Sequence, residues 1–241
     1  MAPVYEEREV KGALGAWSPC VWTRRASGEA TRVVPDGCVD LIWIGGRLEI
    51  AGPDSGHREV GLVAGRRIAG VRLRPGAARL LLGETPASEV LDAQPALGDV
   101  WGNDAGRLEE RIADEPDSWQ VADRLADELC ARLDRFEPDP VAVAVADALD
   151  RPRPPAIAQT AWEFGFSERQ LRRRVIAAVG YGPKTLEQIL RFRRATASAE
   201  AEAEPNWARV AVEQGYADQA HLSRQVRRWS GRTPRDLVAR A

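Results

Sequence analysis

The sequence contains few residues of the kinds that bind metals or form disulfides. Its 241 residues include two histidines, His57 and His221, and three cysteines, Cys20, Cys38 and Cys130. No His or Cys has a neighbour at metal-ligand spacing, which argues against a zinc site or a cupin-type oxygenase. Three widely spaced cysteines indicate reduced thiols rather than a disulfide framework. We therefore expect no metal, no cofactor and no enzymatic activity.

Long apolar runs are absent as well. No stretch of 18 or more apolar residues occurs, which argues against a membrane-spanning helix. The first residues, MAPVYEEREVKGALG, are acidic and lack the apolar segment of a signal peptide. These absences predict a cytoplasmic protein with no membrane partner.

Charge is distributed unevenly along the chain, although the formal net charge is only −2. From Arg151 onward, 17 basic side chains accompany 9 acidic ones, whereas residues 1–150 carry 17 basic and 27 acidic side chains. An acidic first part joined to a basic second part indicates that the second part alone meets a polyanion.

Residues 1 to about 100 have the pattern of short strands and tight turns. The runs CVDLIWI (38–44) and RLEI (47–50) flank Gly45-Gly46, which is a signal for a two-residue hairpin turn. Further short apolar runs, GLVAG, RIAGVRL and ARLLLG, are separated by Gly and Pro. The pattern favours a small barrel or sandwich over a parallel sheet.

Helical periodicity begins after Gly102. Val121, Leu125, Leu129 and Leu133 recur every fourth residue, with acidic side chains on the opposite face. This helix either packs on its own domain or forms a dimer interface. We place a domain boundary after residue 136, so that residues 1–136 form a β-rich domain with trailing helices and 137–241 a second domain.

An internal repeat is the strongest signal in the sequence. Matching pairs are 50 and then 51 residues apart: Ala161/Ala211, Gly165/Gly215, Leu171/Leu222, Val175/Val226, Gly180/Gly231 and Pro183/Pro234. Each copy predicts a helix, a glycine turn, a second helix and a glycine stop, which is a helix-turn-helix. We expect the two copies at about 155–180 and 205–231, with a linker helix at about 183–200.

The second helix of each copy carries polar side chains opposite its apolar face. At ~100° per residue, Leu171 and Val175 share one face and the nearby arginines point away from it. Guanidinium and amide groups on a helix in the major groove read guanine and adenine. The candidate base-reading residues are Arg169, Arg172, Arg173, Gln219, Ala220 and Arg224. Candidate phosphate contacts are Arg174, Ser223, Arg227 and Arg228. The alternative is that these side chains are merely solvated or pair with nearby glutamates.

These residues resemble a known family. AWEFGFSERQLRRRV and GPKTL in copy one, and VAVEQGYADQAHLSRQVRRWSGRTP in copy two, are similar to the DNA-binding domain of AraC-family bacterial transcription regulators. The resemblance implies an all-α domain of two helix-turn-helix units joined by a long helix, which binds double-stranded DNA in two successive major grooves. It also implies contact with RNA polymerase and a homodimer.

The first half resembles the N-terminal domain of some actinobacterial AraC-type regulators. VVPDGCVDLIW, GVRLRPGAARLLLG and DVWG carry this resemblance, which implies a cupin-like β-barrel that senses an effector or dimerises. The overall fold class predicted is therefore α+β. Candidate effector contacts are Trp22, Trp43 and Arg72, although Trp43 shares a strand face with Val39 and Leu41, which more often indicates a core position than a ligand contact.

Two further features have a structural explanation and a functional one. Asp36 and Asp40 bracket Cys38, and paired carboxylates can serve acid/base chemistry. Pro35-Asp36-Gly37 is also a turn sequence, which we favour. The sequence as a whole predicts an effector-responsive, sequence-specific transcription regulator. The alternatives are an enzyme barrel tethered to DNA and a non-specific architectural DNA-binding protein.

Overall fold

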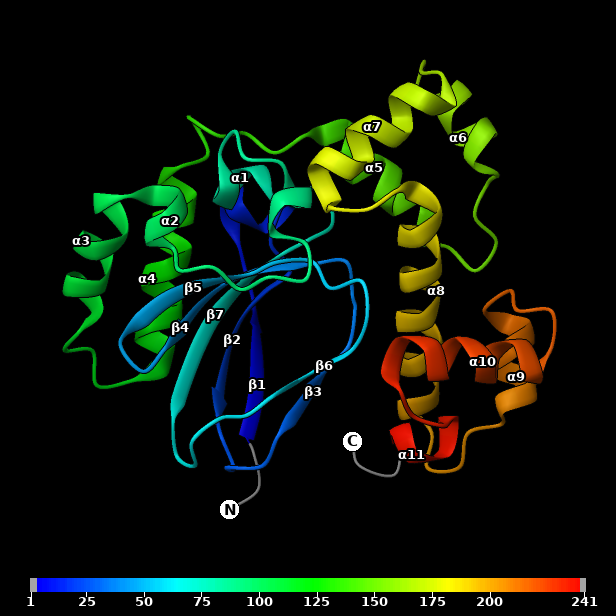
Figure 1. Cartoon of the computed structure of the whole chain (residues 1–241), viewed down its shortest axis with the longest axis horizontal. Helices are drawn as coiled ribbons and strands as arrows, with labels where there is room; N and C mark the ends of the chain where they lie inside the picture. Colours follow the sequence, from blue (N-terminus) through cyan, green and yellow to red (C-terminus); the bar gives the residue numbers. More distant parts are fainter. Residues whose placement is uncertain (1–3, 239–241) are drawn as a thin grey trace.

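The computed structural model describes residues 4–238, with strands confined to the first 73 residues and helices in most of the remainder. The strands form one part of the molecule, and the helices from residue 140 onward lie beside it (Figure 1). The predicted mixed α+β class is confirmed. The division at residue 137 falls between the last helix of the first part and the first helix of the second.

A five-stranded antiparallel sheet forms the centre of the N-terminal domain. Its strand order is β1 (Val4–Glu9), β2 (Cys20–Arg25), β7 (Arg67–Leu73), β4 (Val39–Ile44) and β5 (Arg47–Ala51). The predicted hairpin joins β4 to β5 through Gly45 and Gly46, whose φ angles of 55° and 97° match a primed turn. Alternation along β4 sends Leu41 and Trp43 to one face of the sheet and Asp40 and Ile42 to the other.

A separate two-stranded ribbon faces this sheet. The ribbon pairs β3 (Thr31–Val33) with β6 (Arg58–Val60), and Figure 1 shows it standing apart from the larger sheet. The two sheets are not joined into one closed cylinder by backbone hydrogen bonds within residues 4–238. The space between them forms a cavity, described below.

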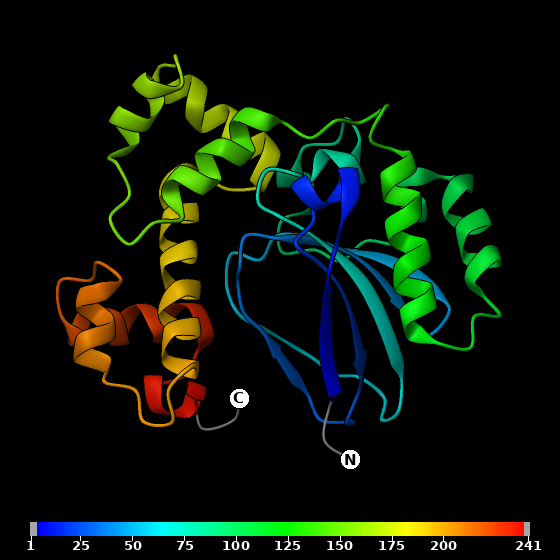
Figure 2. The ribbon, with the colours of Figure 1, turned by 180° about the vertical axis from the view of Figure 1, so that it is seen from behind.

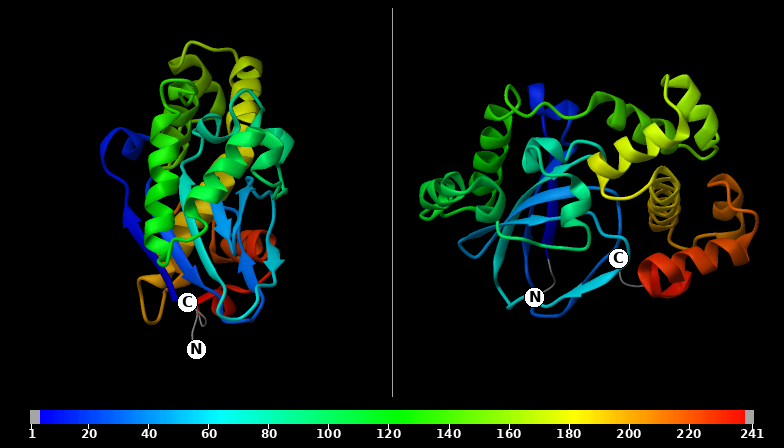
Figure 3. Two further views of the ribbon diagram at one scale, coloured as in Figure 1. Left: turned by 90° about the vertical axis from the view of Figure 1, so that its left-hand side faces the viewer. Right: turned by 45° about the horizontal axis from the view of Figure 1, so that its top comes forward.

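Helices cover the opposite face of the large sheet. α4 (Ser118–Ala131) packs on β7 and β2, on the side away from the C-terminal domain (Figure 3). Its apolar residues Val121, Leu125 and Leu129 are fully buried in its own domain, so this face packs internally and is not a free dimer surface. The other helices here are η1 (Gly12–Ala16), α1 (Arg79–Leu82), η2 (Ala87–Val90), α2 (Gly98–Trp101) and α3 (Asn103–Ile112).

One run expected among the strands is helical. RIAGVRL forms β7, whereas ARLLLG contains the short helix α1. Leu80, Leu81 and Leu82 are all buried, so the run lacks the alternation that distinguishes a half-exposed strand. Gly83, at φ 64°, ends the helix.

The C-terminal domain contains the predicted double helix-turn-helix. The first unit is α6 (Ile157–Glu163) and α7 (Glu168–Val179), and the second is α9 (Trp207–Glu213) and α10 (Gln219–Ser230). α8 (Pro183–Glu200) joins them and, at 18 residues, is about 27 Å long. α5 (Pro140–Leu149) packs against α8, as Figure 2 shows from behind, and α11 (Pro234–Val238) follows the second unit.

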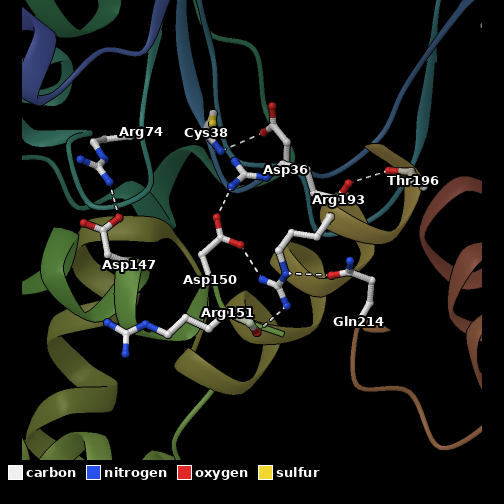
Figure 4. A network of polar contacts seen from close by, with 10 residues as sticks. Asp36, Cys38, Arg74, Asp147, Asp150, Arg151, Arg193, Thr196 and Gln214 are labelled. Carbon is white, nitrogen blue, oxygen red and sulfur yellow. Dashed lines mark hydrogen bonds and ion pairs between the residues drawn. The ribbon is translucent and has the colours of Figure 1, made fainter. Parts of the chain in front are cut away.

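Polar contacts join the two domains beside this helical core. Arg74, directly after β7, forms an ion pair with Asp147 of α5. Asp150, at the end of α5, accepts hydrogen bonds from Arg193 and Arg194 of α8 (Figure 4). The N-terminal domain therefore docks on a surface that is itself fixed by ion pairs.

Candidate nucleic-acid interface and ligand cavity

α7 begins at a capping box and is held from behind by apolar residues. Ser167 Oγ accepts a hydrogen bond from Gln170 N at 3.3 Å, and Gln170 Oε1 accepts one from Ser167 N at 2.9 Å. Leu171, Val175 and Val179 are buried in the core of the C-terminal domain. The helix is thereby anchored at its start and along one face.

α10 repeats this arrangement with different residues. Asp218 Oδ1 accepts a hydrogen bond from His221 N at 2.6 Å, as the predicted cap requires. Leu222 and Val226 are fully buried, and the indole of Trp229, 1% exposed, fills the same core. A large aromatic ring thus compensates for the small Val226.

The six candidate base-reading residues all lie at the surface of these two helices. They are Arg169, Arg172 and Arg173 on α7, and Gln219, Ala220 and Arg224 on α10. Among the described residues, none of the four arginines forms an ion pair or a side-chain hydrogen bond. Their guanidinium donors face solvent and remain available to a polyanion.

Other arginines of the C-terminal domain are neutralised by carboxylates. Arg191 pairs with the buried Glu187, and Arg209 pairs with Glu202 and Glu213. Arg174, predicted to contact phosphate, instead donates to Asp139 at 2.6 and 2.8 Å. The pairing forms because Asp139, the N-cap of α5, is distant in sequence but adjacent in space, and it leaves Arg174 less available to phosphate than the unpaired arginines of α7.

The remaining residues predicted to contact phosphate differ in whether their side chains already have partners within the protein. Arg227 is exposed, and the Arg228 guanidinium carbon lies 4.5 Å from the centroid of the Trp229 ring. Ser223 Oγ donates to the carbonyl oxygen of Gln219 at 2.8 Å. The His221 ring packs edge-on against Tyr216, with centroids 5.3 Å apart, which fits a packing role.

A cavity of about 170 Å³ lies between the large sheet and the β3–β6 ribbon. Its apolar wall comes from β-strands and their connections: Ile42, Ile44, Val60, Leu62 and Ile68. Its polar lining comprises Tyr5, Arg24, Thr31, Asp36, Asp40, Asp54, Arg58, Arg72 and Gln94. A small molecule with an apolar body and a polar group matches this mixture.

Ion pairs dominate one part of the cavity wall. Arg72 lies 3.3 Å from Asp40, 3.2 Å from Glu7 and 3.8 Å from Asp36. Burial raises the pKa of Asp40 from 3.8 to about 6, although Arg72 opposes this shift. The pKa of Arg72 is itself raised, chiefly by Asp40. This guanidinium is thus already neutralised within the protein.

The structure separates the three predicted effector contacts. Trp22 and Arg72 line the cavity, whereas Trp43 lies on the other face of β4 in the domain core. Trp43 is therefore not proposed as a ligand contact, in line with the alternation that places it beside Val39 and Leu41. Sequence analysis missed Arg24, although it lies two residues beyond Trp22 on the same strand face.

The segment around Cys38 is a turn. Cys38 N donates to Asp36 Oδ1 at 2.8 Å, and Gly37 has a φ of 87°. Burial raises the pKa of the Cys38 thiol, which makes it less nucleophilic.

Within residues 4–238, no group of three His, Cys, Asp or Glu side chains could hold a metal ion. Nor does any helix there have the length and hydropathy needed to cross a membrane.

Comparisons with known proteins agree with this architecture. Residues 160–240 match the family described as a helix-turn-helix domain, and residues 11–95 match a domain of unknown function (DUF6597). No curated protein matches the chain significantly.

Several solved structures also resemble the chain. ToxT from Vibrio cholerae has 10% sequence identity and a TM-score of 0.50, over 91% of this chain and 96% of ToxT. An apo ToxT variant has 12% identity and a TM-score of 0.50, over 96% and 99%. A Chromobacterium violaceum regulator with an AraC-type DNA-binding domain has 26% identity over 41% of this chain and 88% of its own, with a TM-score of 0.37. At these identities the ToxT likeness concerns the fold, while the helix-turn-helix match supports DNA-binding transcription regulation.

Proposed function

We propose, on the premise that the C-terminal part of the chain is an AraC-type helix-turn-helix domain, that this protein is a sequence-specific transcription regulator. In this proposal α7 and α10 enter two successive major grooves of double-stranded DNA. A small molecule in the N-terminal cavity regulates binding.

The observation that carries this proposal is the contrast between two sets of arginines. Arg169, Arg172 and Arg173 are exposed and unpaired among residues 4–238, whereas Arg174 and Arg191 are held by carboxylates. Unpaired guanidinium groups on a rigid helix can form bidentate hydrogen bonds with guanine without first breaking an ion pair. If α7 were only a solvated surface helix, nothing would favour leaving these three arginines unpaired while neighbouring arginines form ion pairs.

The length of α8 supports reading by both units. A helix of about 27 Å separates two units whose recognition helices each present donors to solvent. Successive major grooves on one side of B-DNA lie about 34 Å apart, which a small bend of the DNA can accommodate. We assign the base-reading contacts to the six residues named above and phosphate contacts to Arg227 and Arg228.

Some parts of the proposal rest on the sequence and not on geometry. A homodimeric state, contact with RNA polymerase and a bacterial source follow from the family resemblance, and a cytoplasmic location follows from the sequence prediction. The apolar face of α4 does not supply the dimer interface, because it is buried within its own domain.

The proposal is tested by selecting binding sites from random duplex DNA with the full-length chain. We expect enrichment of one sequence and protection of two major-groove segments about one helical turn apart. A triple alanine variant at positions 169, 172 and 173 should lose the enriched sequence, whereas Arg153→Ala, at an exposed position outside the recognition helices, should retain it. Equal affinity for all sequences would favour an architectural protein.

A further inference from the structure

Arg24 is an incompletely satisfied cation in the wall of the cavity. Its Nη2 donates to Thr31 Oγ1 at 2.5 Å, while its Nε is buried without a hydrogen-bond partner. No carboxylate forms an ion pair with it within residues 4–238. Partial burial lowers the pKa of this guanidinium, because desolvation disfavours the charged form.

The other two arginines of the cavity are neutralised. Arg58 Nε donates to Asp54 Oδ1 at 2.9 Å, and Arg72 pairs with Asp40. Arg24 therefore differs from them in lacking a counter-ion. Arg24 is partly buried and its Nε has no hydrogen-bond partner, so a bound anion would offset the cost of leaving this donor unsatisfied.

Apolar side chains lie on one side of Arg24, whereas the polar Tyr5 and Thr31 also adjoin it. Ile68 faces Arg24 on the adjacent strand β7, Ile44 lies one strand further on β4, and the Trp22 ring forms part of the same cavity wall. The indole lies across Gly70 of β7, where a Cβ would come within 2.6 Å of two ring carbons. Glycine at this position thus leaves room for a flat aromatic surface against which an apolar ligand can pack.

We propose that the cavity binds a small organic anion, such as a carboxylate with an apolar body, whose charged group pairs with Arg24. The carboxylate would accept hydrogen bonds from the Arg24 guanidinium, whose side chain would turn to bring the buried Nε to the cavity. Its apolar part would lie against Trp22, Ile44 and Ile68.

The same site is connected to a DNA-reading helix through the β3–β6 ribbon. Thr31, the hydrogen-bond partner of Arg24, is followed by Arg32, whose side chain lies on the outer face of the ribbon. Arg32 Nη1 donates to the carbonyl oxygen of Ser230 at 2.8 Å, and Arg32 Nη2 pairs with Glu59 at 2.5 Å. Ser230 is the last residue of α10, and a cation at the C-terminus of a helix interacts favourably with the helix dipole.

This geometry gives the ligand a route to the second helix-turn-helix unit. An anion that draws Arg24 away from Thr31 changes the position of β3, a strand of only three residues, and hence of Arg32. The contact between Arg32 and α10 then changes. This second part of the inference rests on the proposed function, whereas anion binding at Arg24 does not.

Anion binding is tested by thermal unfolding and calorimetry with three carboxylates: octanoate, 3-phenylpropionate and 1-naphthoate. Octanol and octylamine serve as neutral and cationic matches. We expect at least one carboxylate to bind the wild-type chain and to raise its Tm. Arg24→Gln should weaken that binding at least 10-fold, Arg24→Lys less, and Arg25→Gln, at the exposed neighbouring position, not at all.

Three results would overturn the proposed anion site. They are no binding by any of the carboxylates, equal binding to the Arg24→Gln and wild-type chains, and octylamine binding as tightly as octanoate. Since Arg24→Lys keeps the positive charge, retained binding in that variant separates loss of the charge from a general loss of structure.

Coupling is tested with the carboxylate that binds and the DNA sequence selected above. In the wild-type chain the carboxylate should change DNA affinity by roughly 5- to 150-fold, and DNA should change carboxylate affinity by the same factor. Arg32→Ala should still bind the carboxylate but lose this mutual effect. An unchanged coupling in Arg32→Ala would overturn the route, whereas absence of specific DNA binding by the wild type would refute the proposed function and leave the anion site standing.

Discussion

Gly180 and Gly231 occupy the same position in the two helix-turn-helix units, and both lie against the N-terminal domain. Each ends its recognition helix in the left-handed conformation, with φ of 97° and 67°. A Cβ at Gly180 would lie 2.6 Å from Pro53 Cγ, and one at Gly231 would lie 2.5 Å from His57 Nε2. The N-terminal domain thus contacts both units at equivalent points.

Replacing Gly231 should therefore destabilise the folded protein. Gly231→Ala should lower the free energy of unfolding by ~1–2 kcal/mol from the left-handed backbone, with a further loss from the approach of His57. Urea unfolding measures this change. Gly106→Ala in α3 is the matched control, because a Cβ there meets nothing within 4 Å and should stabilise the helix slightly. A Gly231→Ala variant as stable as the wild type would contradict the expectation.

Arg173 should contribute to sequence discrimination. Arg173→Ala should cost about 1–3 kcal/mol of preference at one base position, because its exposed guanidinium has no partner within residues 4–238. Competition binding with single-base variants of the selected site measures this preference. Arg153→Ala removes an exposed arginine outside the recognition helices and should leave the preference intact. A site selection identical for the Arg173→Ala and wild-type chains would refute the role.

Arg227 and Arg228 should affect affinity but not sequence choice. Phosphate contacts release counterions, so the double alanine variant should reduce the slope of log affinity against log salt by roughly 1 per arginine. Titrations between low and moderate salt concentrations measure the slope. If the slope stays the same while the preferred sequence changes, these residues read bases instead.

Asp40 should make stability depend on pH. Burial raises its pKa from 3.8 to about 6, so the folded state holds the proton more tightly than the unfolded state. Its contribution to stability is then full below pH 3.8 and is lost as the pH rises towards 6. The stability of the wild type relative to Asp40→Asn should fall across this window, as measured by denaturant unfolding at several pH values. A difference independent of pH would rule out the raised pKa.

The capping box of α7 should make a measurable contribution to the free energy of unfolding. Ser167→Ala removes the acceptor for Gln170 N and should lower the free energy of unfolding by about 0.5–2 kcal/mol. Ser167→Asp keeps an acceptor at the same position and should restore most of this loss. If both variants are equally unstable, the cap is not the source of the effect.

The sequence predicts the C-terminal domain well because its signals are local. The repeat of Gly165 and Gly215 with buried leucines specifies both helix-turn-helix units, and Gly182-Pro183 marks the start of α8. The hairpin at Gly45 and Gly46 is likewise predicted, since the turn requires positive φ at both residues.

Features that depend on residues distant in sequence are not predictable in this way. Arg174 pairs with Asp139, 35 residues earlier, and nothing in the local pattern separates it from the exposed Arg173. The position of the β3–β6 ribbon, and with it the surroundings of Arg24, depends on how two three-residue strands fold over the sheet. Alternation along β2 does place Trp22 and Arg24 on one face, but it does not show that the face encloses a cavity.

The length of the connection between β5 and β6 is constrained by its contacts with both helix-turn-helix units. Residues 52–57 supply Pro53 to the end of α7 and His57 to the end of α10, while Asp54 in the same segment and Arg58 at the start of β6 line the cavity. Surface loops usually tolerate insertions and deletions. Here a change of a single residue in length would displace the two contacts relative to each other, so we expect length variation to be excluded from this connection.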